Sequence, residues 1–136
     1  MTDIPVLKLG PVLFLTVPET LNDAQAKSLE ESVLVQLERT RATAVVIDIT
    51  SMEIIDSFMA RVIAETAQAA RIMDARVVVV GMSPVATITL LELGLDMEGI
   101  TTAMDLEAGL VRLGYKLVSV NSSTDLRALP AEGDKT

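Results

Sequence analysis

The sequence predicts a single α/β domain in which a mixed, mostly parallel β-sheet carries about four helices. Two runs, 44–49 and 76–81, are rich in Val and Ile, and such continuous apolar runs are typical of strands buried on both faces. The residues between them have helical periodicity, so the two strands are expected to be parallel and joined by a right-handed crossover. The length of 136 residues corresponds to one domain.

The first third of the chain is expected to form a hairpin followed by a helix. Residues 4–9 and 12–17 are β-rich runs separated by a Gly-Pro pair, a combination that favours an antiparallel hairpin. Asn22 and Gln25 have the spacing of a capping box, and apolar residues recur every three or four positions after them, which predicts a helix over 22–40. That apolar stripe consists of Ala26, Leu29, Val33 and Leu37.

Each of the two Val-rich runs is followed by a predicted helix. The helix over 57–73 has its apolar residues on one side. The helix over 84–93 begins at a proline and ends before Gly94, which are the residue types favoured at a helix start and just past a helix end. A short strand over 99–102 and a last helix over 105–113 are expected to follow.

The C-terminal part of the chain has weaker signals. Residues 115–120 either add a further strand or have no regular structure, whereas the residues after them are polar and include Pro, Gly and charged side chains. This composition predicts a flexible tail over 119–136. The folded domain is therefore expected to span residues 1–118.

The residue types that the chain lacks exclude several kinds of chemistry. It has no Cys and no His, so disulfides, thiolate or imidazole metal sites, cysteine nucleophiles and Ser-His-Asp triads cannot form. The sequence predicts no catalytic residue, no metal ion and no cofactor. The net charge of −8 argues against binding to nucleic acid or to an anionic membrane. No run approaches the roughly 20 apolar residues of a membrane span, and no signal peptide is evident, so a cytoplasmic protein is expected.

Functional side chains of such a sheet are expected where the parallel strands end and the next helices begin. Ser57 lies at the predicted start of a helix or one position after it, where free backbone N–H groups and the helix dipole favour a phosphate group. From the residues alone, capping of the helix by Asp56 or Ser57 is the commoner role.

The carboxylates of the same region have two interpretations each. Asp48 ends a strand, where it could accept a phosphoryl group as in receiver domains, but organisation of the following loop by hydrogen bonds is preferred. Glu53 and Asp56 are close enough in sequence to form an acid–base pair. Their loop is expected to be exposed, which favours ordinary solvated charges.

Two stretches of the sequence resemble the STAS domain, the domain of anti-sigma-factor antagonists and of sulfate-transporter tails. They are VVIDITS at 45–51 and IDSFMARVI at 55–63, and the likeness continues in VVVVGMSP at 77–84 and LELG at 91–94. Within this family the chain is most similar, over about residues 4–117, to the RsbS-type stressosome scaffold subgroup.

The resemblance implies a regulatory, non-enzymatic role. In this family the Ser at the start of this helix is the phosphoacceptor of a partner-switching serine/threonine kinase, which corresponds to Ser57. A second acceptor of sensory paralogues falls at Thr89, with Thr87 nearby. The surface that binds the partner is expected to comprise Glu53, Ile55, Asp56, Phe58, Arg61, Met82 and Ser83.

The subgroup also implies partners. Its members form large homo- or hetero-oligomeric stress-signalling complexes with paralogous STAS proteins that carry N-terminal sensory domains. Such a scaffold sequesters the kinase until phosphorylation releases it, and a serine phosphatase belongs to the same system.

Two other functions are compatible with the sequence. A small hydrolase or isomerase would use Asp48, Glu53 or Asp56 and would need a closed pocket. A small-molecule or lipid sensor that acts as a simple anti-anti-sigma factor would have an apolar cavity between the sheet and a helix.

Overall fold

The computed structural model describes residues 4–94, 100–119 and 126–130, and its centre is a five-stranded sheet with the order β1-β2-β3-β4-β5. Within this sheet, strands β1 and β2 pair antiparallel, and the other three pairs of neighbouring strands are parallel. The predicted hairpin and the parallel pairing of the two Val-rich strands are therefore confirmed. The strands are β1 (Leu7–Leu9), β2 (Val12–Thr16), β3 (Ala44–Asp48), β4 (Arg76–Val80) and β5 (Thr101–Ala103).

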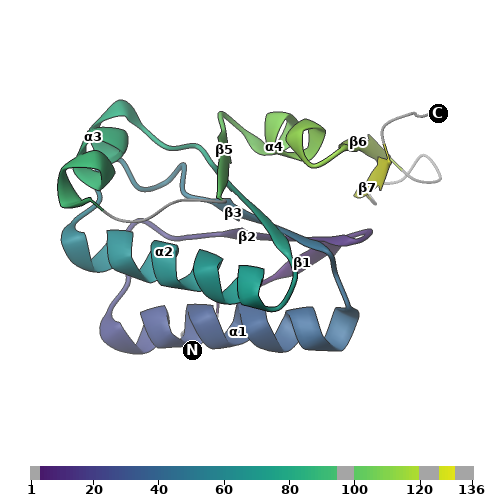
Figure 1. Ribbon diagram of the computed structural model, residues 1–136, viewed down its shortest axis with the longest axis horizontal. Coiled ribbons are helices and arrows are strands. Elements are labelled where there is room, and N and C mark those ends of the chain that lie inside the picture. The colour runs from purple at the N-terminus through teal and green to yellow at the C-terminus, as the bar shows by residue number, and fades with distance from the viewer. Residues whose placement is uncertain (1–3, 95–99, 120–125, 131–136) are drawn as a thin grey trace.

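The four helices of the described residues cover both faces of the sheet. They are α1 (Asp23–Thr40), α2 (Ser57–Ile72), α3 (Pro84–Leu93) and α4 (Leu106–Arg112). Helices α1 and α2 lie side by side on one face, α4 lies on the other, and α3 follows the carboxyl end of β4 (Figure 1). All four correspond to helices that the sequence predicts.

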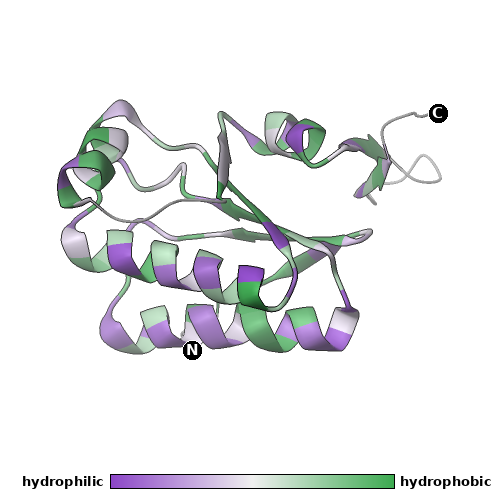
Figure 2. Ribbon diagram, in the orientation of Figure 1, coloured by the Kyte–Doolittle hydropathy of each residue, from purple (hydrophilic) through white to green (hydrophobic). Residues whose placement is uncertain are grey.

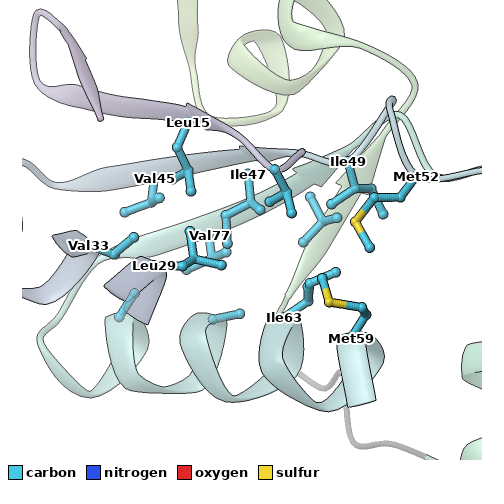
Figure 3. Close-up of a cluster of buried hydrophobic side chains, with 14 of the residues drawn as sticks. Leu15, Leu29, Val33, Val45, Ile47, Ile49, Met52, Met59, Ile63 and Val77 are labelled. Atoms are coloured by element: carbon cyan, nitrogen blue, oxygen red, sulfur yellow. The ribbon is translucent and has the colours of Figure 1, made fainter. Parts of the chain in front are cut away.

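The larger core lies between the sheet and helices α1 and α2 (Figure 3). Leu29 and Val33 of α1 and Ile63 of α2 point toward Val45 and Ile47 of β3. Ala44 and Val46, which alternate with these two residues along β3, belong to a second cluster on the opposite face. The strand is thus buried on both faces, as its uninterrupted apolar sequence predicts.

Helix α1 shows how local sequence sets an element boundary. The Asn22 side chain accepts a hydrogen bond from the Gln25 backbone N–H at 2.8 Å, and the Gln25 side chain accepts one from the Asn22 N–H at 3.0 Å. This is the predicted capping box. Arg41 is the C-cap that follows the last helical residue; it has the left-handed backbone conformation and donates its N–H to the carbonyl of Leu37.

The second face of the sheet is covered by α4 and by a C-terminal hairpin of β6 (Tyr115–Ser119) and β7 (Leu126–Pro130). The sequence predicts a flexible tail over 119–136, whereas β7 is an ordered strand within it. Ala128 of β7 is fully buried against β1 and β2, so pairing with β6 and contact with the sheet order this segment. Residues 120–125 and 131–136 of the predicted tail lie outside the described residues.

Two strand predictions need adjustment. Of the two alternatives for 115–120, the strand forms as β6, which pairs with β7 in a separate two-stranded sheet, and residue 120 lies outside the described residues. The strand expected over 99–102 appears as β5, which begins at Thr101 and extends to Ala103, and residue 99 lies outside the described residues.

Candidate functional site

The loops that follow β3 and β4 are held together at the carboxyl edge of the sheet. Gly81 has a φ of 81°, and a Cβ atom there would lie 2.9 Å from the Cα of Thr50. Only glycine permits both this conformation and this approach. The Ser83 hydroxyl donates to the carbonyl of Glu53 at 2.9 Å and accepts from the N–H of Ala86 at 3.0 Å. Ser83 therefore caps α3 and ties it to the loop before α2.

Asp48 organises the beginning of that loop. Its Oδ1 accepts hydrogen bonds from both the backbone N–H and the side-chain hydroxyl of Thr50. A carboxylate engaged in this way supports the loop-organising interpretation over a phosphoryl acceptor. Groups of three or more acidic side chains that could hold a metal ion do not occur within the described residues.

Asp56 and Ser57 differ in their roles at the start of α2, where the sequence allows either residue to cap the helix. Asp56 is the N-cap of α2, and its Oδ1 accepts from the N–H of Met59 at 2.8 Å. Ser57 is the first residue of the helix and is exposed. Its hydroxyl makes no hydrogen bond to any described residue. Because capping is supplied by its neighbour, the Ser57 hydroxyl is free and faces solvent at a helix N-terminus.

The apolar part of the predicted partner surface needs one correction. Ile55 is 2% exposed and belongs to the main core, so it cannot contact a partner. Its neighbour Ile54 is 75% exposed. The loop leads into α2 at this point, and Ile55 is the loop residue whose side chain packs in the core. Phe58, which follows the phosphoacceptor candidate, is 40% exposed.

The remaining predicted surface residues lie around the start of α2 and one helical turn further. Glu53, Asp56 and Arg61 are exposed, and Ser83 is half-buried. Met82 is also half-buried and packs against the main core, so it contributes only part of its side chain. The residues from 53 to 58, Ile55 excepted, are exposed and form open surface where a hydrolase would need a closed pocket.

Helix α3 carries an exposed apolar face that lies outside the predicted partner-binding surface. Ile88 is 55% and Leu91 is 75% exposed, and only Ala86 and Leu90 of this helix are buried. Figure 2 shows hydrophobic colour along much of it. A helix that is apolar all round is normally buried. The sequence of α3, PVATITLLEL, has one charged residue in ten and therefore indicates such a helix.

The two candidate secondary acceptors also lie on α3. The Thr87 hydroxyl donates to the carbonyl of Ser83 at 2.9 Å, and the Thr89 hydroxyl donates to the carbonyl of Val85 at 3.0 Å. Thr87 is exposed and Thr89 is half-buried. Both hydroxyls are thus engaged with their own helix, in contrast to that of Ser57.

The sequence matches the STAS domain family over residues 3–108, and the chain belongs to this family. A substituted form of RsbS from Moorella thermoacetica has a similar structure, with a TM-score of 0.73 and 33% sequence identity over 81% of this chain and 93% of that one. A chain from a structure of the stressosome, described as a signal integration and transduction hub, gives a TM-score of 0.73 and 35% identity over 80% of this chain and 95% of that chain.

A curated relative is the RsbT co-antagonist protein RsbRA of Bacillus subtilis (strain 168), which is 29% identical over 91 residues. The match covers 67% of this chain and 33% of RsbRA, so the chain spans about a third of the length of that relative. In the described part of the chain, no helix has the length and apolar character that crossing a membrane requires.

Proposed function

We propose that this chain is a non-enzymatic, cytoplasmic scaffold of a stressosome-type complex, which sequesters a serine/threonine switch kinase and releases it when Ser57 is phosphorylated. The observation that carries the proposal is the exposed Ser57 hydroxyl at the first position of α2, which makes no hydrogen bond to any residue that the structure describes. The likeness to RsbS, to a stressosome chain and to an RsbT co-antagonist supports the partner-switching role.

The chemistry belongs to the kinase, and this chain supplies the nucleophile. The Ser57 oxygen attacks the γ-phosphorus of ATP, the bond from that phosphorus to the bridging oxygen of ADP breaks, and the hydroxyl proton passes to a base of the kinase. Hydrolysis of the resulting phosphoester by a serine phosphatase returns the hydroxyl and releases inorganic phosphate. Neither step requires a catalytic residue of this chain.

Release follows from the change in surface chemistry. Phosphorylation adds about −1.5 to −2 charges at neutral pH, next to the exposed carboxylates of Glu53 and Asp56. A partner held through Ile54 and Phe58 would have to desolvate this charge, which weakens binding. The modified Ser57 lies where the helix N-terminus stabilises anions, so the fold itself is expected to persist.

Assembly with other STAS proteins is the second part of the proposal. The apolar side chains of Val85, Ile88 and Leu91, spaced three residues apart on α3, are 53%, 55% and 75% exposed, and a contiguous exposed apolar patch marks an interaction site. The similarity to a stressosome chain supports an oligomer that includes paralogues with sensory domains.

Incubation of the purified chain with the cognate switch kinase and ATP, followed by peptide mass spectrometry, tests the assignment. We expect one phosphate on the peptide that contains Ser57, and none there in Ser57→Ala. Thr87→Ala is the matched control, because it removes an exposed hydroxyl that is already hydrogen-bonded and should leave the modification of Ser57 unchanged. A wild-type chain that stays unmodified at Ser57 would refute the proposal.

A further inference from the structure

The only basic side chain near Ser57 in the sequence is that of Arg61, one helical turn away. Between Arg41 and Arg71 the chain has no other Lys or Arg, and between Arg76 and Arg112 it has none. Arg61 is exposed, and it makes no hydrogen bond or ion pair with any residue that the structure describes. A cation that makes no ion pair with the described residues, although acidic residues are near it in the sequence, is available to bind an anion that the unmodified protein lacks.

The spacing of the two residues suits a contact between their side chains. Ser57 and Arg61 both belong to α2, and residues four apart on a helix have Cβ atoms about 5–6 Å from each other. An anion that precedes a cation by four residues is the more favourable order of the two. The guanidinium group also presents two parallel N–H donors that match the oxygens of a phosphate group.

Carboxylates compete with a phosphate group for Arg61. Arg61 lines a surface groove of about 440 Å³ between α1 and α2 together with Glu30 of α1 and Glu65 of α2. Glu53 and Asp56 are also exposed and precede α2 in the sequence. Each carboxylate carries one negative charge, whereas a phosphoserine carries nearly two, so the phosphate group is the strongest acceptor within reach.

We propose that Arg61 is the internal counter-ion of phosphorylated Ser57, which it engages through the guanidinium group after modification. This inference rests on the proposed function for the phosphorylation of Ser57 and adds how the modified state is held. Arg61 also belongs to the partner-binding surface that the resemblance to STAS domains implies. Phosphorylation then alters that surface twice, because it adds an anion and withdraws the Arg61 guanidinium group from the partner.

Titration of the phosphate group by phosphorus NMR tests the inference without any kinase. Phosphoserine is placed at position 57 during synthesis, in otherwise wild-type chain and in Arg61→Gln. We expect the second pKa of the phosphate to be lower by about half a pH unit when Arg61 is present. Arg39→Gln removes an exposed cation from the last turn of α1 and should leave the phosphate pKa unchanged, whereas Arg61→Lys should keep it low.

An equal phosphate pKa in the wild-type and Arg61→Gln chains would overturn the inference, as would an equal effect of Arg39→Gln. These outcomes are separate from failure of the proposed function. A kinase that leaves Ser57 unmodified would refute that function, but it would not change the titration of a phosphoserine that was placed there synthetically.

Discussion

At the scale of single residues, Asp56 and Ser57 have different roles at the start of α2. The Asp56 carboxylate accepts the hydrogen bond that a helix N-terminus requires, and this leaves the Ser57 hydroxyl free. If Ser57 were the cap, its oxygen would be held by the helix and would have to be released before phosphoryl transfer. A capped helix with a free hydroxyl at its first residue is therefore suited to modification without unfolding.

The capping role of Asp56 predicts different effects of two substitutions at position 56. Asp56→Ala removes the acceptor for the Met59 N–H and should lower the free energy of unfolding by about 1 kcal/mol. Asp56→Asn keeps a good capping side chain and should change it much less. Urea denaturation followed by circular dichroism measures both. Equal destabilisation by the two variants would contradict the capping role.

The residue scale is also where sequence reasoning was least accurate. Asp56 and Ser57 are adjacent, and so are Ile54 and Ile55. A loop has no periodic pattern, so the sequence does not decide which residue of each pair caps the helix or enters the core. Which of the two isoleucines enters the core depends on the path of the chain between β3 and α2. That path is held by the hydrogen bond from Ser83 to the Glu53 carbonyl, a contact between segments far apart in sequence.

At the scale of elements, the strongest sequence signals gave correct predictions. The two Val-rich strands and helix α1, with its capping box, are set by residues that are close together in the chain. The sequence does not predict strand β7, because LRALP has no marked alternation and contains a proline. It is ordered by pairing with β6 and by burial of Ala128, and both depend on the tertiary fold.

Helix α4 lies so close to the sheet that one of its positions must be glycine. A Cβ atom on Gly109 would come within 2.8 Å of a methyl group of Val80 and 3.1 Å of one of Val78. Ala favours a helix over Gly by about 1 kcal/mol, whereas overpacking of a core destabilises by about 1–3 kcal/mol. We therefore expect Gly109→Ala to lower the free energy of unfolding by about 1 kcal/mol.

The matched control on the same helix is Glu107→Ala, because Glu107 is exposed and its replacement adds nothing to the interface. Thermal unfolding of both variants distinguishes packing from helix propensity. A Gly109→Ala chain that is more stable than wild type would show that α4 can move away from the sheet without cost.

At the scale of the whole molecule, the surface combines net negative charge with exposed apolar side chains near the candidate site. The chain carries 19 acidic and 11 basic residues, and Ile54, Phe58 and Leu91 are exposed. Apolar contacts can hold a partner, whereas added negative charge can repel it.

The most direct test of this account is the affinity of the switch kinase for two forms of the chain, unmodified and with phosphoserine at position 57, measured by calorimetry. We predict that the phosphate weakens binding at least about tenfold, which corresponds to about 1.4 kcal/mol, while circular dichroism shows the same fold. Equal affinity of the kinase for the two forms would contradict the account.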